Sequence, residues 1–235
     1  MREANYWRPV IVSVSVGCGL LAGGCATTGL GGRTVTANYS SALVQIDRPE
    51  ATKERYGSVV TIKPEPDNKY VYEDGLFSGL FFATASRINF TITNMTDHSI
   101  KIIWDEAAFI DLDGQSGRVA HEGVKYADRN ASQPPSVIPG GRSLTDFVLP
   151  TNRVYYREGY YSRYSSIPGG WEELPLVLPA SRRVAPGDST LVDTFASEVS
   201  KNKGKRFGLL LPLEIEGVVN EYTFWFEVQQ ASVVP

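Results

Sequence analysis

Cysteine and histidine are scarce in this chain of 235 residues, which contains two of each. The two cysteines, Cys18 and Cys25, share one apolar stretch in which a disulfide has nothing to link, and without further ligands they cannot complete a zinc site. No apolar run reaches the ~18 residues of a membrane-spanning helix. The formal net charge is only −3, so no positive field favours nucleic acid as a partner.

The overall composition is that of a folded globular protein. Hydrophobic residues make up 42% of the chain, aromatic residues 11% and charged residues 21%, a balance typical of chains with a packed core. The length suits one large or two small domains. We find no internal repeat with a period of about 20–50 residues, which argues against a solenoid or a propeller.

Motifs of common enzyme classes are missing as well. The chain contains no G-x-S-x-G, no G-x-x-x-x-G-K-[ST] and no G-x-G-x-x-G. His121 and Glu122 begin like a zinc-protease motif, but Lys125 stands where the second histidine is needed. We therefore expect His98 and His121 at the surface, no metal or other cofactor, and no enzymatic activity. A hydrolase whose triad is assembled only in space is the less favoured alternative.

Two pairs of carboxylates deserve separate interpretations. Asp111, Asp113 and Gly114 begin like a calcium loop, but the third acid and the distal glutamate are absent. Asp-Gly is also a hairpin-turn sequence, so we predict a turn there, and cation binding by the two aspartates is the alternative. Glu172 and Glu173 are adjacent and point in opposite directions on a strand, which we interpret as a solvated turn.

The first residues are organised like an export signal. Residues 1–9 are weakly positive, and residues 10–22 are uncharged and apolar or small throughout. That length fits the apolar region of a signal peptide and is too short for a stable membrane anchor. Small residues then lead directly to Cys25.

The segment LAGGC, from Leu21 to Cys25, resembles the lipobox of bacterial lipoproteins. The resemblance implies that the Cys25 thiol receives a diacylglyceryl group, that cleavage removes residues 1–24, and that the new amine is acylated. Acyl chains such as palmitate contribute about 0.8 kcal/mol per buried methylene, so several of them hold a protein on a membrane essentially permanently. Lipidation of Cys18 and an ordinary cleaved secretory signal are the alternatives.

We divide the remainder into a tether and one domain. Residues 25–55 are rich in Gly, Thr, Ser and Ala without sustained periodicity, which indicates a lipidated N-terminus and tether. A first strand in the sheet, centred near residues 42–46, is the alternative. Residues 56–235 are expected to form a single β domain.

Period-two patterns predict the strands of that domain. Ile88, Phe90 and Ile92 share one face, and after a polar turn Ile100 and Trp104 align again, with Ile102 between them. Near the C-terminus, two further sets share faces on either side of a turn at residues 217–221. They are Leu209, Leu211, Leu213 and Ile215, and then Tyr222, Phe224, Phe226 and Val228. Pro212 predicts that the first of these strands lies at an edge or carries a bulge.

Helical signals are few. Residues 189–204 form one plausible short helix ending at Gly204, and the alternative is a strand over residues 190–195 followed by a basic loop. Short strands, many turns and few helices predict an all-β fold, an antiparallel immunoglobulin-like β-sandwich. Lys201 to Arg206 form a basic loop, which contacts anionic lipid headgroups or is simply a solvated turn.

The stretch at residues 153–171 is unlike ordinary scaffold. Tyrosine and arginine bring contact area and hydrogen bonds to interfaces, so we predict a partner-binding patch on a protruding hairpin or loop. Its residues are Arg153, Tyr155, Tyr156, Arg157, Tyr160, Tyr161, Arg163, Tyr164 and Trp171. The alternative is that half of the tyrosines cover the edge of the sandwich.

These features together predict a lipid-anchored protein of the cell envelope with a non-enzymatic binding or scaffolding role. By resemblance to enterobacterial lipoproteins, Ala26 after the cysteine favours the outer membrane of a Gram-negative bacterium, with the domain facing the periplasm or the surface. The expected partner is an envelope protein. The alternative is a module that binds glycan or peptidoglycan through the aromatic stretch.

Overall fold

The computed structural model describes residues 32–48, 61–65 and 69–234. Within them the fold is all-β and antiparallel, as predicted. The first strands are β1 (Arg33–Asp47), β2 (Thr61–Glu65), β3 (Lys69–Glu73), β4 (Phe77–Ala83), β5 (Ile88–Asn94), β6 (Ile100–Ile102), β7 (Ala108–Ile110), β8 (Ser116–His121), β9 (Ser136–Ile138) and β10 (Ser143–Pro150). The others are β11 (Val154–Arg157), β12 (Tyr160–Tyr161), β13 (Ser166–Ile167), β14 (Gly170–Glu173), β15 (Ser181–Val184), β16 (Arg206–Ile215) and β17 (Val218–Val234).

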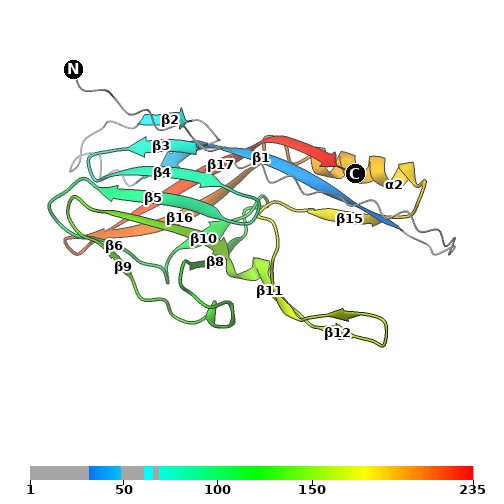
Figure 1. The fold of residues 1–235 in the computed structure, drawn as a ribbon. Coiled ribbons are helices and arrows are strands. Elements are labelled where there is room, and N and C mark those ends of the chain that lie inside the picture. Colours follow the sequence, from blue (N-terminus) through cyan, green and yellow to red (C-terminus); the bar gives the residue numbers. More distant parts are fainter. Residues whose placement is uncertain (1–31, 49–60, 66–68, 235) are drawn as a thin grey trace, which may run out of the picture. The chain divides into compact units, whose positions relative to one another are not determined.

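Thirteen of the strands described belong to one continuous sheet. Its order is β15-β1-β17-β16-β7-β8-β10-β5-β4-β3-β2, with β6 beside β16 and β9 beside β6. The sheet curls, so that β3, β4 and β5 lie across from β16 and β17 (Figure 1). Two small pairs, β11–β14 and β12–β13, stand apart from it.

Aromatic side chains fill the space inside the curl. Phe81 on β4 stacks on Phe224 of β17 with ring centroids 4.2 Å apart, and Phe77 meets Tyr222 edge-on at 5.1 Å. Burial of such rings contributes the largest share of core stability. The inward faces predicted for the strands are confirmed by burial of these residues: Ile88, Phe90, Ile92, Ile100, Ile102, Trp104, Leu209, Leu211, Leu213, Ile215, Tyr222, Phe224, Phe226 and Val228.

The C-terminal hairpin turns more tightly than its sequence predicts. Only Glu216 and Gly217 separate β16 from β17, and their φ angles are 49° and 76°. A two-residue turn with positive φ at both positions matches the right-handed twist of the strands. The turn therefore ends at Gly217, and residues 218–221 already belong to β17.

Pro212 does not mark a sheet edge or a bulge, because β16 pairs without a register shift with β17 and lies between β17 and β6/β7. The proline faces the point where the neighbouring strand is interrupted between β6 and β7. Its carbonyl accepts a hydrogen bond from the N–H of Ile103 at 3.0 Å on that side. Pro212 has no N–H to donate, but it lies where the pairing of β16 with β6 and β7 is already interrupted, so no further hydrogen bond of the sheet is lost.

The tether interpretation is corrected for Arg33–Asp47, which forms strand β1 in the sheet, as the alternative held. β1 pairs with β15 at its start and with β17 along most of its length. Register shifts between Ser40 and Ser41 and between Leu43 and Gln45 interrupt the period-two pattern. Residues 25–31 and 49–55 of the predicted tether lie outside the described ranges.

The predicted helix is confirmed as α2 (Ser189–Ser200), which ends four residues before the predicted end at Gly204, and the strand alternative is wrong. Asp188 caps the helix, its carboxylate accepting from the N–H of Leu191 at 2.9 Å. Phe195 and Val199 are buried against β1 and β15. The described ranges also contain two short 3₁₀ turns, η2 (Tyr126–Asp128) and η3 (Thr151–Arg153).

A buried carboxylate joins the two sides of the core. Asp74, in the turn between β3 and β4, accepts hydrogen bonds from the hydroxyls of Tyr72 at 2.7 Å and Tyr222 at 2.9 Å. It also accepts from the backbone N–H of Leu76, and Arg48 lies 3.8 Å away. Burial, together with the nearby Asp74 charge, raises the pKa of Tyr72. This network ties β17 to the β3–β4 turn.

Candidate functional site

The stretch predicted as a contact patch forms a two-part projection, which we call the tyrosine hairpin (residues 154–173). Its inner part is the antiparallel pair β11–β14, and its outer part is the pair β12–β13. Figure 1 shows it extending away from the curled sheet. The prediction of a protruding hairpin is therefore confirmed.

Two glycines join the inner and outer parts of the tyrosine hairpin. A Cβ on Gly159 would lie 2.8 Å from the backbone nitrogen of Gly169, and a Cβ on Gly169 would lie 2.9 Å from that of Gly159. The two backbones approach too closely there for any side chain. At the tip, the N–H of Ser162 donates to the carbonyl of Ser165 at 2.7 Å, which closes the turn.

None of the five tyrosines of the hairpin is buried. Their exposure ranges from 41% at Tyr155 to 91% at Tyr164. Exposed aromatic side chains can bind a partner without giving up packing contacts inside their own domain. This exposure fits a contact patch better than a cover for the sheet edge.

Glu172 organises one face of the inner part. The Tyr155 hydroxyl donates to its carboxylate at 2.5 Å, and the Arg157 Nε–H donates to its other oxygen. The hydrogen bond from Tyr155 and then the one from Arg157 lower the pKa of Glu172, and the same bond raises the pKa of Tyr155. Glu172 lies on β14 and not in the solvated turn predicted for it.

The opposite face of the inner part carries an aromatic contact. Tyr156 meets Trp171 on the paired strand edge-on, with ring centroids 5.4 Å apart. Of the remaining predicted contact residues, Arg163 is exposed near the tip. Arg153 ends η3 before the hairpin and is half-buried, and its Nε has no hydrogen-bond partner in the described part of the chain.

Trp171 stands at the base of the hairpin and not at its outer part. Tyr126 of η2 meets its ring edge-on at 6.1 Å, and the guanidinium of Arg129 lies 5.1 Å from its ring centroid. Arg129 is itself held by the carbonyls of Tyr126 at 2.7 Å and Thr151 at 3.1 Å. Trp171 therefore fixes the hairpin to the loop between β8 and β9.

Glu173 fastens the same base to the turn between β4 and β5. Its carboxylate accepts two hydrogen bonds from Arg87, at 2.5 and 3.1 Å, one from Ser86 at 2.6 Å, and one from the Tyr126 hydroxyl. The hydrogen bonds from Arg87 lower the pKa of Glu173 to about 2, against a smaller opposing effect of burial. The solvated-turn prediction is wrong for Glu173 too.

His98 is exposed as predicted, but the surface prediction is wrong for His121. The His121 ring stacks on Trp104 at 4.2 Å, and its side chain is only 13% exposed. Its Nδ1 lies 3.1 Å from the carboxylate of Asp146 on the neighbouring strand β10. The other oxygen of Asp146 accepts from the backbone N–H of Glu122 at 2.8 Å, and among the described residues no serine hydrogen-bonds to this pair.

Asp111 shapes the turn predicted for it. Its carboxylate accepts from the backbone N–H groups of Asp113 at 3.0 Å and Gln115 at 2.9 Å, and Gly114 has a φ of 78°. The hairpin-turn interpretation is therefore confirmed. Within the described ranges, no group of three or more His, Cys, Asp or Glu side chains is placed to hold a metal ion.

The basic loop after α2 is a turn in which two basic side chains lie near carboxylates and two others are exposed. Lys205 lies 4.0 Å from Asp113, and Arg206 contacts Glu227 at 3.1 Å, while Lys201 and Lys203 are exposed. In the part of the chain that the structure describes, no helix is long and apolar enough to span a membrane. Cys25 and the predicted signal lie outside the described residues.

Comparison of the chain with protein-family models, with curated proteins and with solved structures gives no match.

Proposed function

We propose that this chain is a lipid-anchored protein of the cell envelope that binds a partner and has no catalytic role. The anchor is Cys25, made N-terminal by removal of residues 1–24. The support for it is the sequence LAGGC after an uncharged apolar stretch. Ala26 after the cysteine supports the outer membrane as the site of the anchor.

The tyrosine hairpin is the proposed contact surface, and its exposure is the observation that carries the proposal. Four exposed tyrosines lie on the paired strands and the fifth, Tyr164, lies in the turn at the tip, while Glu173 and Trp171 fasten the base. A projection fixed at its base loses little conformational entropy when it binds, which favours affinity. The core of the domain gains nothing from these side chains, so a scaffold role alone gives no reason for them.

A protein partner fits this surface better than a glycan. Small ligands are held in concave sites that bury most of their surface, whereas the tyrosine hairpin projects outward. A projecting hairpin rich in tyrosine can enter a groove of a second protein and bury its rings there. Glycan or peptidoglycan, stacked on the same rings, is the alternative that the exposed aromatic faces favour.

We also propose that the two sides of the curl correspond to the two sheets of an immunoglobulin-like sandwich. Rings from the two sides of the curl pack face to face, as they do between the sheets of a sandwich. The continuous pairing of β7 with β8 connects those sides at one edge.

A photoreactive amino acid at the hairpin tests the binding role. We would place it at Tyr161 and, as a matched control, at Val137, which is 53% exposed on β9. Irradiation of intact membranes should give one discrete protein adduct from position 161 and none from position 137. Adducts of equal yield at both positions, or none at either, would refute the proposed surface, and a saccharide adduct would favour the glycan alternative.

A further inference from the structure

Four triplets of the chain have the sequence of an acceptor for N-linked glycosylation. The acceptor sequence is asparagine, then any residue except proline, then serine or threonine. It begins at Asn38, Asn89, Asn94 and Asn130. Because such short triplets also occur by chance, the structure around each one decides whether a transferase can use it. The enzyme has to reach both the amide and the hydroxyl, which favours an exposed loop over a paired strand.

The triplets at Asn89 and Asn94 are part of the packed sheet. The amide nitrogen of Asn89 is buried, and the next residue, Phe90, is 1% exposed. Asn94 is itself 1% exposed, and its Nδ2 donates to the carbonyls of His98 at 2.6 Å and Ile138 at 2.9 Å. Neither amide is accessible to an enzyme while the domain is folded.

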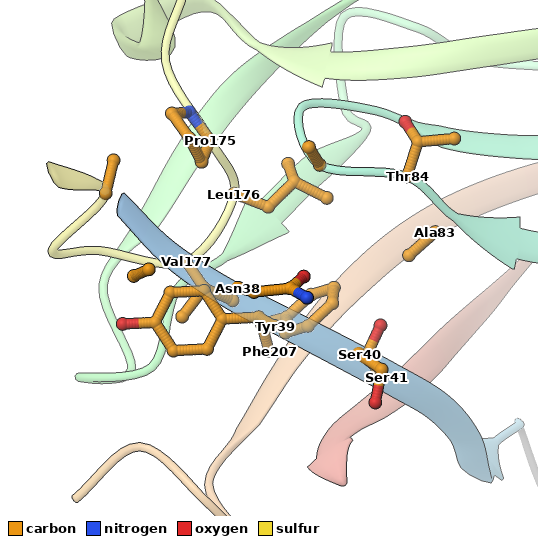
Figure 2. Close-up of a pocket in the computed structure, with 13 residues that line it drawn as sticks. Asn38, Tyr39, Ser40, Ser41, Ala83, Thr84, Pro175, Leu176, Val177 and Phe207 are labelled. Atoms are coloured by element: carbon orange, nitrogen blue, oxygen red, sulfur yellow. The ribbon is translucent and has the colours of Figure 1, made fainter. Parts of the chain in front are cut away.

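The triplet at Asn38 is at the surface but belongs to a strand. All three of its residues pair with β17. Figure 2 shows the triplet on β1, beside residues 175–177 at the border of a hollow of about 300 Å³. The middle residue, Tyr39, donates its hydroxyl to the carbonyl of Pro179 at 3.0 Å. The amide of Asn38 is therefore exposed, while the backbone of the triplet is held in the sheet.

The triplet at Asn130 lies in the loop between β8 and β9, just after η2. Its three residues, Asn130, Ala131 and Ser132, are exposed and belong to no helix or strand. The N–H of Ala131 donates to the carbonyl of Asp128 at 2.8 Å, which closes a turn with Asn130 at its third position. In the described part of the chain the Asn130 side chain makes no hydrogen bond. Its amide is therefore available to an enzyme.

The hydroxyl of this triplet is held only by a surface contact. Ser132 donates to the carboxylate of Asp105, whose side chain is 40% exposed and also lies 2.8 Å from Arg118. Water can replace Ser132 at such a carboxylate, so the serine is released at little cost when an enzyme binds it.

An acidic residue accompanies the triplet at Asn130 and none of the other three. Asp128 stands two residues before Asn130, whereas Thr36, Arg87 and Ile92 stand two residues before the other asparagines. The Asp128 side chain is exposed and makes no hydrogen bond or ion pair within the described ranges. An unpaired carboxylate offers a transferase a charged contact next to the amide.

We propose that Asn130 carries an N-linked glycan. The donor is an oligosaccharide on a polyprenyl diphosphate, and a membrane-bound transferase catalyses the reaction. Nδ2 of Asn130 forms a bond to C1 of the first sugar and loses one proton to a base of the enzyme. The bond from C1 to the diphosphate oxygen breaks, and the polyprenyl diphosphate leaves with the electron pair.

This inference rests on the export and lipid anchoring of the proposed function. A lipid-anchored acceptor and a lipid-linked donor lie at the same membrane during export, which raises their effective concentration. The site does not depend on the partner of the tyrosine hairpin.

The test is mass spectrometry of the mature protein purified from membranes of the cells that naturally produce it. We expect the peptide that contains Asn130 to carry added sugar residues and to release sugar oxonium ions on fragmentation. Asn130→Gln should lose the added mass, whereas Asn38→Gln, the matched control in the other exposed triplet, should keep it. Ser132→Ala should lose it too, and Ser132→Thr, which retains a hydroxyl, should keep it. Asp128→Asn should lower the glycosylated fraction several-fold.

An unmodified Asn130 in the native protein overturns the inference, as does a glycan that persists in Asn130→Gln or in Ser132→Ala. The same digest reports separately on the proposed function. A lipidated Cys25 together with an unmodified Asn130 would overturn the glycan and leave the anchor standing. A glycosylated Asn130 in a protein whose Cys25 is unmodified would support the glycan and refute the anchor.

Discussion

Glu173→Gln should weaken the domain in a manner that depends on pH. The Glu173 carboxylate is held by Arg87, Ser86 and Tyr126, and its pKa falls from 4.5 to about 2. That difference corresponds to at most about 3 kcal/mol of folding free energy. Because the Arg87 side chain is 35% exposed, water screens the pair, and we expect about 1–2 kcal/mol.

The sign of the effect follows from the direction of that pKa. Since folding favours the ionised carboxyl, the stabilisation is complete above the unfolded-state value of 4.5 and is lost as the pH falls towards about 2. The difference in free energy of unfolding between the native chain and Glu173→Gln, from urea titrations followed by circular dichroism, should therefore shrink between pH 5 and pH 2, that is, across about the interval between the two pKa values.

Glu172→Gln provides the matched control, because Glu172 is the preceding residue of the same strand and its contacts are at the surface. This variant should unfold at the same urea concentration as the native chain at neutral pH. A Glu173→Gln effect that stays constant over the whole pH range, or that Glu172→Gln reproduces, would refute the reasoning.

Three further changes probe other parts of the structure. Asp74→Ala removes the buried acceptor of two tyrosine hydroxyls and should cost about 3 kcal/mol or more in urea unfolding; a cost near zero would contradict the network. Gly159→Val places a side chain against the backbone of Gly169 and should abolish hydrogen-exchange protection in β12 and β13 while leaving the core protected. Asp188→Ala removes the cap of α2 and should destabilise the domain by about 1 kcal/mol, measured as a lower Tm, and an unchanged Tm would show that the cap is redundant.

The strands that the sequence predicts best are those with one buried face and regular pairing. Ile88, Phe90 and Ile92 alternate without interruption, as do the inward residues of β16 and β17. The prediction of a tether fails for β1 because its register shifts break the alternation by which a strand is recognised in the sequence. The prediction of an edge or a bulge at Pro212 fails for a related reason, since the local sequence pattern does not show that the neighbouring strand is interrupted.

The exposed part of the candidate site is predictable and its base is not. Tyrosine and arginine density alone identifies the hairpin, because a core has no use for so many polar rings in sequence. The partners of Glu173 come from 47, 86 and 87 residues away along the chain. His121 likewise stacks on Trp104 and contacts Asp146, which is 25 residues distant on a neighbouring strand. Such contacts follow from the sheet order, which no local pattern specifies.

The most direct test of the proposed function is mass spectrometry of the N-terminal peptide from the native protein in the membrane fraction. We predict a peptide that begins at Cys25 and carries a diacylglyceryl group on sulfur and an acyl group on nitrogen. Cys25→Ser should correspondingly leave the membrane fraction. A peptide that begins elsewhere, or that contains Cys25 with an unmodified thiol, would contradict it.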